Sequence, residues 1–103
     1  MYIEKDYPIE NNDKAAVLFF HAPWCSQCKS MEQFLKTNES SEYDIISIDV
    51  DKFPKAADDL NFRALPAFGF YKDNQLSSEV VTGRMTLNEF EIMAKNKLFA
   101  TED

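Results

Sequence analysis

The sequence predicts an α/β protein in which helices flank a mixed central sheet of four to five strands, and two observations support this. Strand-like and helix-like segments alternate in the first part of the chain, which is typical of parallel strands joined by a right-handed crossover. Further along, two strand-like segments flank a tight turn, which predicts an antiparallel hairpin. The 103 residues suit one hydrophobic core, so we expect a single domain over residues 1–103.

The first part of the chain has one clear strand and one clear helix. We expect an edge strand over residues 1–5, a turn or single helical turn over residues 7–13 and a buried strand over residues 15–21. A helix follows over residues 25–36, and residues 37–41 end it. The apolar run of the buried strand is continuous rather than alternating, which predicts burial on both faces. The helix is predicted because Met31, Phe34 and Leu35 fall on one face with Cys28.

The second part alternates in the same way and ends in a helix. We expect a buried strand from residue 43 and a short helix that opens at Pro54. A hairpin follows, with strands that begin at residues 67 and 76, and a last helix begins at residue 86. Asp73 and Asn74 suit the tight turn of the hairpin. Thr86 and Glu89 have the spacing of a capping box. We expect the two helices to place these residues in the core: Ala56, Ala57, Leu60, Leu87, Phe90, Met93, Ala94 and Leu98.

Composition and charge exclude several classes of partner. The net charge is −7, and no cluster of Lys and Arg is present to bind phosphate, so we expect neither nucleic acid nor an anionic membrane as partner. No apolar run reaches the ~20 residues of a membrane-spanning helix. The N-terminus lacks the basic and apolar regions of a signal peptide, so we expect a cytoplasmic protein.

Both cysteines of the chain lie in Trp24-Cys25-Ser26-Gln27-Cys28-Lys29, between the buried strand and the helix. The N–H groups and the dipole at a helix N-terminus stabilise a thiolate and lower its pKa. A disulfide between residues three apart closes so short a loop that it adds little stability. The pair is therefore a plausible redox switch rather than a structural link.

Other uses of the same residues are weaker. A structural zinc site needs four ligands, and Cys25, Cys28 and His21 are too few, so we expect no metal. His21 is interpreted as a packing residue close to the site that could also modulate the thiols. Asp49 and Asp51 are interpreted as solvated charges at the end of a strand.

With these features in place, the chain resembles the thioredoxin family over about residues 15–99. The resemblance depends on four features in the same order as in the family: Ala22-Pro23-Trp24-Cys25-x-x-Cys28-Lys29, Ile48-Asp49-Val50-Asp51, Leu65-Pro66-Ala67 and Val81-Thr82-Gly83. The resemblance implies a thioredoxin fold. The segment before Cys25 is short for the family, so this fold would have a shortened N-terminal region and could lack the family's first helix.

The resemblance also implies roles for individual residues. Cys25 would be the nucleophile that attacks a substrate disulfide, and Cys28 would resolve the mixed disulfide. Pro66 matches the family's cis-proline beside the dithiol. The remaining substrate contacts would be made by the backbone of Leu65, by Gly83, where another backbone can approach closely, and by Trp24.

The chain departs from the family's pattern around the cysteines. Ser26 and Gln27 replace the usual Gly-Pro, and we hypothesise that the N–H of Gln27 stabilises the Cys25 thiolate and makes the protein less reducing. Phe19 stands where the family has a buried Asp, and Ser47 where it has a Lys, which predicts slow resolution by Cys28 near neutral pH. Residues expected to modulate the thiols are therefore Ser26, Gln27, Lys29 and Phe19. The family's helix proline is replaced by Gln33, which predicts a straighter helix.

The function expected from this resemblance is that of a small protein-disulfide reductase. It would act on disulfide-containing proteins as a monomer and take electrons from NADPH through a flavin-dependent thioredoxin reductase. The chain has no nucleotide-binding fingerprint, so it would bind no cofactor itself. Two alternatives remain: a glutathione-linked, glutaredoxin-like protein, and an interaction module or accessory subunit in which the dithiol is incidental.

Overall fold

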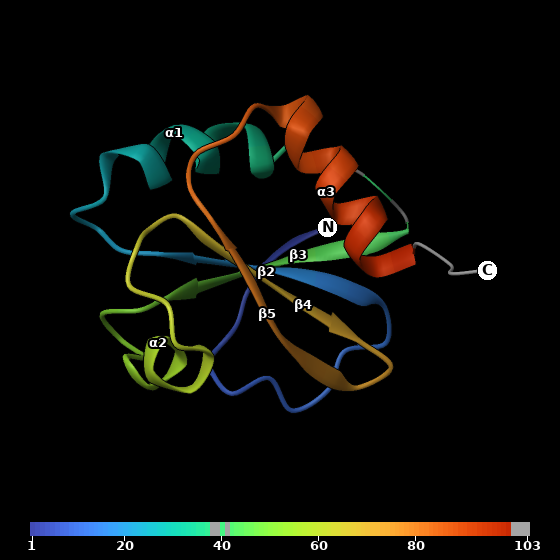
Figure 1. Cartoon of the computed structure of the whole chain (residues 1–103). Helices are drawn as coiled ribbons and strands as arrows, with labels where there is room; N and C mark the ends of the chain where they lie inside the picture. The colour runs from blue at the N-terminus through green and yellow to red at the C-terminus, as the bar shows by residue number, and fades with distance from the viewer. Residues whose placement is uncertain (38–39, 41, 100–103) are drawn as a thin grey trace.

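The computed structural model describes residues 1–37, 40 and 42–99, which are built around a five-stranded sheet in the order β1-β3-β2-β4-β5 (Figure 1). The elements are β1 (Tyr2–Glu4), β2 (Ala15–His21), α1 (Ser26–Leu35), β3 (Tyr43–Asp49), α2 (Lys55–Leu60), β4 (Ala67–Lys72), β5 (Gln75–Thr82) and α3 (Leu87–Phe99). Strands β1, β3 and β2 are parallel, whereas β4 and β5 form an antiparallel hairpin that joins the sheet at β2. The predicted α/β architecture with a mixed sheet is confirmed.

Two hydrophobic clusters cover the two faces of the sheet, because successive side chains of a strand point in opposite directions. Helices α1 and α3 pack on one face and α2 on the other (Figure 1). The buried residues of the first cluster, here called the dithiol-side cluster, are Val17, Phe19, Cys25, Cys28, Met31, Leu35, Tyr43, Ile45, Phe68, Phe70, Phe90, Ala94 and Leu98. Those of the second, the opposite cluster, are Tyr7, Ala16, Leu18, Phe20, Ile46, Ile48, Ala56, Phe62, Ala67 and Tyr71.

The predicted hairpin turn and capping box are both present, and the structure adds a left-handed residue at the end of α2. Asp73 and Asn74 adopt φ values of 55° and 60°, the left-handed conformation of a tight hairpin turn. The Thr86 N–H donates to Glu89 Oε1 at 2.9 Å, and the Glu89 N–H donates to Thr86 Oγ1 at 3.1 Å, as a capping box requires. Asn61, with φ 57°, ends α2 in the left-handed region.

Several expectations about the helices need correction. Leu87 was expected in the core, but it is the first residue of α3 and its side chain is exposed. Ala57, Leu60 and Met93 are only partly buried. Residues 7–13 form bends and no helical turn, and in the described part of the chain no helix precedes α1. Residues 38, 39, 41 and 100–103, which include most of the predicted helix end and the tail, lie outside the described residues.

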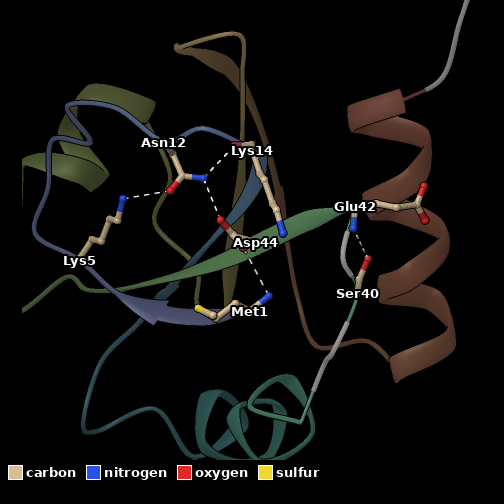
Figure 2. A network of polar contacts seen from close by, with 7 residues as sticks. All are labelled: Met1, Lys5, Asn12, Lys14, Ser40, Glu42 and Asp44. Carbon is tan, nitrogen blue, oxygen red and sulfur yellow. Dashed lines mark hydrogen bonds and ion pairs between the residues drawn. The ribbon is translucent and has the colours of Figure 1, made fainter.

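The segment before β2 is held in place by polar contacts instead of a helix. Asn12 is central to them: its Oδ1 accepts from Lys5 Nζ at 3.0 Å, and its Nδ2 donates to Asp44 Oδ2 at 3.1 Å (Figure 2). Further along the segment, Tyr7 Oη donates to Asp59 Oδ2 at 2.9 Å and so connects it to α2. These contacts connect the segment to β3 and to α2.

Candidate functional site

Cys25 and Cys28 form a disulfide at the N-terminus of α1. Strand β2 ends at His21, and a turn in which the Cys25 N–H donates to the Ala22 carbonyl oxygen at 3.1 Å leads into the helix. Cys25 is the N-cap residue, with extended backbone angles, and its Sγ accepts a hydrogen bond from the Cys28 N–H at 3.2 Å. The sequence thus places both sulfur atoms at the positive end of the helix.

The two cysteines differ in their access to solvent. Cys25 retains 7% of its surface and Cys28 only 2%. A helix N-terminus favours the thiolate form of a cysteine at the N-cap position. The side chains of Ser26, Gln27 and Lys29 are exposed around the pair. The N–H group that contacts Cys25 Sγ belongs to Cys28, so the hypothesis about the Gln27 N–H stays a prediction.

Two loops from other parts of the chain, one before β4 and one after β5, are joined to each other by a hydrogen bond. The Leu65-Pro66 peptide bond is cis, and the Gly83 N–H donates to the Pro66 carbonyl oxygen at 2.9 Å. Leu65 is half-buried and packs against the dithiol-side cluster, which contains both cysteines. Gly83 has φ 109°, a conformation that a side chain disfavours, and a Cβ placed there would meet no other atom within 4 Å. The space above Gly83 is therefore open to a ligand.

Trp24 lies at the surface immediately before the pair. Its side chain is 70% exposed, and its indole N–H donates to Asp51 Oδ1 at 3.2 Å. Asp49 Oδ1 in turn accepts from the Asp51 N–H at 2.8 Å, which holds the turn after β3. Asp49 is the last residue of β3 and Asp51 is exposed, so both carboxylates lie at the end of the strand, where each also accepts a hydrogen bond.

Phe19 fills the interior beneath the disulfide. It is fully buried in the dithiol-side cluster, with its ring centroid 5.7 Å from that of Phe68 and 5.2 Å from that of His21. The position therefore offers the cysteines an apolar neighbour with no proton-accepting group.

His21 and Ser47 form a polar pair that sequence reasoning did not find. His21 Nε2 and Ser47 Oγ are 2.6 Å apart across neighbouring strands. Burial lowers the pKa of His21 below 6.5, against the opposing effect of the carboxylates of Glu32, Asp49 and Glu4. Both residues line a pocket of about 340 Å³ at the carboxyl ends of the parallel strands. One sequence signal pointed to this pair, because odd-numbered residues of the two parallel strands share a face of the sheet. The register between the strands, which decides which residues meet, is not visible in the sequence.

Tyr2 lies on β1, the strand next to β3. Its hydroxyl group is buried and makes no hydrogen bond of ordinary geometry among the described residues, although the Ser47 side chain is near enough to oppose the effect of burial on its pKa. Burial is the main cause that raises the pKa of Tyr2 to about 12.

No metal site accompanies these groups in the described part of the chain, where no three His, Cys, Asp or Glu residues are arranged to hold an ion. Among the same residues, no helix combines the length and apolar character needed to cross a membrane.

Comparison with known proteins finds thioredoxins. The family model described as Thioredoxin matches residues 4–96. Thioredoxin-1 of Drosophila melanogaster is 39% identical over 67 residues, which cover 62% of this chain and 63% of that protein. A thioredoxin of Aspergillus fumigatus is 39% identical over 85 residues, covering 78% of this chain and 75% of the other. Chloroplastic and mitochondrial thioredoxins also match.

Solved structures agree with the sequence matches. The crystal structure of the germline-specific thioredoxin Deadhead from Drosophila melanogaster superposes with a TM-score of 0.68 at 34% identity, covering 82% of each chain. A thioredoxin from Malassezia sympodialis gives a TM-score of 0.74 at 23% identity, which supports the fold alone. The chain spans less than two thirds of the Drosophila Thioredoxin-1 sequence that it matches.

Proposed function

The chain belongs to the thioredoxin family, and from this premise we propose that it is a thiol-disulfide oxidoreductase that reduces protein disulfides through Cys25 and Cys28. The observation that carries the proposal is the Cys25–Cys28 disulfide at the N-terminus of α1. A short-loop disulfide at a helix N-terminus can open and close without disturbing the fold, and its reduced form contains a stabilised thiolate.

The reaction has two exchange steps. The Cys25 thiolate attacks one sulfur of the substrate disulfide, so that a mixed disulfide forms and the other substrate sulfur leaves as a thiolate. Cys28, as a thiolate, then attacks Cys25 Sγ. The bond between Cys25 and the substrate breaks, the second substrate sulfur leaves, and the Cys25–Cys28 bond closes. Two electrons pass from the protein to the substrate.

The order of attack follows from the surroundings of the two sulfur atoms. Cys25 is the N-cap residue of α1 and the more accessible of the pair, which suits the nucleophile. Cys28 is nearly inaccessible, so an external disulfide cannot reach it, whereas Cys25 is adjacent.

The substrate segment would bind across Leu65, Pro66 and Gly83, with Trp24 at its border. The open space at Gly83 supports this binding position, and the hydrogen bond from the Trp24 indole N–H to Asp51 holds the indole in place. An extended substrate could hydrogen-bond to the backbone of Leu65, as in β-strand addition.

Residues around the pair would tune its chemistry. We expect Gln27→Pro to lower the reduction potential, and an unchanged potential would contradict the role given to the Gln27 N–H. Ser26 and Lys29 are exposed beside the pair and would have smaller effects. Because Phe19 offers no proton acceptor, resolution by Cys28 should be slow near neutral pH, and Phe19→Asp should speed it in single-turnover measurements if the variant folds.

Turnover requires an outside source of electrons. By family, that source is NADPH acting through a flavin-dependent thioredoxin reductase, and the chain itself would bind no cofactor. We further propose that the protein acts as a monomer in the cytoplasm. Its net charge of −7 favours separation of the chains in solution.

The test is reduction of insulin disulfides with dithiothreitol as the electron source, which avoids any dependence on the reductase. The wild type should accelerate the reaction over dithiothreitol alone, and Cys25→Ser should abolish the acceleration. Cys28→Ser, reduced and then freed of dithiothreitol, should accumulate a mixed disulfide with insulin. A wild-type rate equal to that of dithiothreitol alone would overturn the proposal.

Titration of the pair against a glutathione buffer would then separate a reductant from a glutathione-linked protein. A potential well below the cytosolic glutathione poise indicates a reductase of protein disulfides. A potential at or above that poise favours the glutaredoxin-like alternative. If a Cys25→Ser, Cys28→Ser double variant kept the biological role, the interaction-module alternative would be favoured instead.

A further inference from the structure

The second exchange step requires that the Cys28 thiol lose its proton, and the interior beneath the pair offers no group to receive it. Cys28 retains only 2% of its surface, so bulk water has little access to the sulfur atom. On β2 its cluster contains the fully buried ring of Phe19. Asp44, the one buried acidic residue in the described part of the chain, lies at the other end of the sheet and contacts Asn12. A proton acceptor for Cys28 must therefore come from the border of the core.

Glu32 lies one helical turn beyond Cys28 on α1. Residues four apart on a helix are neighbours, with Cβ atoms roughly 5–6 Å apart. Helical side chains also lean toward the N-terminus of the helix, so Glu32 covers the turn that carries Cys28. Met31 and Leu35 on the same side of α1 are buried, whereas the side chain of Glu32 retains 31% exposure. Glu32 is thus next to Cys28, at the border between the buried face and solvent.

The carboxylate of Glu32 also acts on the strands beneath α1. Burial lowers the pKa of His21 on β2 and raises that of Tyr2 on β1, and the Glu32 carboxylate adds an upward effect to both. Such an effect falls with distance, so the carboxylate lies on the side of α1 that faces these strands. Glu32 Oε1 is also 3.3 Å from Lys36 Nζ, one turn further on. Its side chain therefore lies along the stripe of α1 that begins at Cys28.

We propose that Glu32 is the general base that receives the proton of the Cys28 thiol in the second exchange step. The inference rests on the proposed function and assigns a residue to its resolution step. As Cys28 Sγ attacks Cys25 Sγ, the S–H bond of Cys28 breaks and its proton passes to a carboxylate oxygen of Glu32. The bond between Cys25 and the substrate breaks, and the substrate sulfur leaves as a thiolate. A general base acts directly or through one water molecule, a span that the next turn of a helix satisfies.

The exposure of Glu32 explains how the cycle is completed. A carboxylate that retains 31% exposure can release the proton to water after each turnover. It is also a weaker acceptor than an enclosed one, because water competes for the same proton. Resolution therefore stays slow, as expected from the apolar ring of Phe19, and what remains of it depends on Glu32.

A purely electrostatic role of Glu32 would have the opposite sign. A carboxylate close to a thiolate disfavours the charged form, so loss of the carboxylate would raise the thiolate fraction of Cys28 and speed resolution. A general base instead speeds proton transfer, by roughly 10²–10⁴-fold in enclosed sites. The direction of the change in Glu32→Gln therefore distinguishes the two roles.

The experiment mixes the reduced, full-length protein with an excess of a bis(carboxynitrophenyl) disulfide, which releases one coloured thiolate at each exchange step. In stopped flow, the phase whose rate rises with the probe concentration is attack by Cys25, and the phase whose rate does not is resolution by Cys28. For Glu32→Gln we expect resolution to slow by about tenfold, less than in an enclosed site because water also accepts the proton. Attack should stay within about twofold of the wild type, the effect of one exposed charge.

Three further variants separate the base from charge and packing. Glu32→Asp keeps a carboxylate and should recover part of the lost resolution rate. Lys36→Gln breaks the ion pair but keeps the Glu32 carboxylate, so resolution should not slow. Glu79→Gln is the matched control for net charge, because Glu79 is also ion-paired with a lysine, Lys97 of α3, and both phases should keep their wild-type rates.

The outcomes separate this inference from the proposed function. Equal or faster resolution in Glu32→Gln would overturn the inference alone, provided that the wild type releases two thiolates per chain. An equal loss in Lys36→Gln or Glu79→Gln, or no recovery in Glu32→Asp, would overturn it as well. Release of fewer than two thiolates by the wild type would mean that the bond between Cys25 and Cys28 does not close, and the proposed function itself would fail.

Discussion

Phe19 and Phe20 are neighbours in β2, yet they belong to opposite faces of the molecule. Both are fully buried and both pack against another aromatic ring, Phe68 in one case and Phe62 in the other. Phe19 shares its cluster with the two cysteines, whereas Phe20 lies in the cluster beneath α2. Phe19 and Phe20 thus show that both faces of the sheet are covered by packed side chains, but only one face contains the two cysteines.

The two faces are also closed in different ways. Helices α1 and α3, of 10 and 13 residues, cover the dithiol side. The other side has the six-residue α2 and a non-helical segment that is joined to it through Tyr7 and Asp59. Changes to the second face should therefore affect stability without affecting the reactivity of Cys25.

The largest effect should come from matched truncation of the two rings. Phe19→Ala and Phe20→Ala should each lower the free energy of unfolding by about 3–5 kcal/mol, the usual cost of removing a buried Phe ring. Only Phe19→Ala should also raise the reduction potential, because water that reaches the sulfur atoms stabilises the thiolate of the reduced form. Urea unfolding and glutathione titration measure the two quantities, and an equal change in potential for Phe20→Ala would contradict the separation of the faces.

A smaller effect is expected from crowding the second face. A Cβ at Gly69 would lie 3.1 Å from the Phe20 ring, closer than normal van der Waals contact. Gly69→Ala should therefore cost about 1–3 kcal/mol of unfolding free energy, the range for an overpacked core. The reduction potential should stay at the wild-type value, and a shift in it would mean that strain crosses the sheet to the cysteines.

Removal of one hydrogen bond on the second face should have a more modest effect. Tyr7→Phe deletes the hydrogen bond to Asp59 and should cost about 0.5–1.5 kcal/mol. That hydrogen bond is also the main cause that lowers the pKa of the Asp59 carboxyl group, so the pKa should rise in the variant. NMR titration of Asp59 checks this prediction, with the rate of insulin reduction as a control that should not change.

The smallest effect is expected in the pH dependence of stability on the dithiol side. Burial lowers the pKa of His21 below its unfolded value of 6.5, so the unfolded chain binds more protons between the two values. The contribution of neutral His21 is complete above pH 6.5 and is lost as the pH falls through the interval below it. As the pH is lowered from 7.5 to 5.5, the free energy of unfolding of the wild type should therefore fall relative to that of His21→Gln. Tyr7→Phe should show no such shift.

Much of the fold and of the dithiol was predictable from the sequence, because the signals are local. The Cys-x-x-Cys spacing, the turn at Asp73 and Asn74, and the capping box at Thr86 each involve residues within a few positions of one another. Their conformations depend mainly on backbone preferences and on neighbouring side chains. The exposed position of Leu87 shows the limit, since helical spacing alone did not indicate which residues at a helix start face the core.

The sequence by itself determined the order of strands and helices and the pairing of two cysteines at a helix N-terminus. Only the tertiary structure decided which distant groups meet: His21 with Ser47, Trp24 with Asp51, and Tyr7 with Asp59. The same holds for the loops before β4 and after β5, which are joined through Pro66 and Gly83. The physical reason is that such contacts depend on strand register and on how elements pack across the whole sheet, and these are set by burial of the complete core rather than by any local pattern.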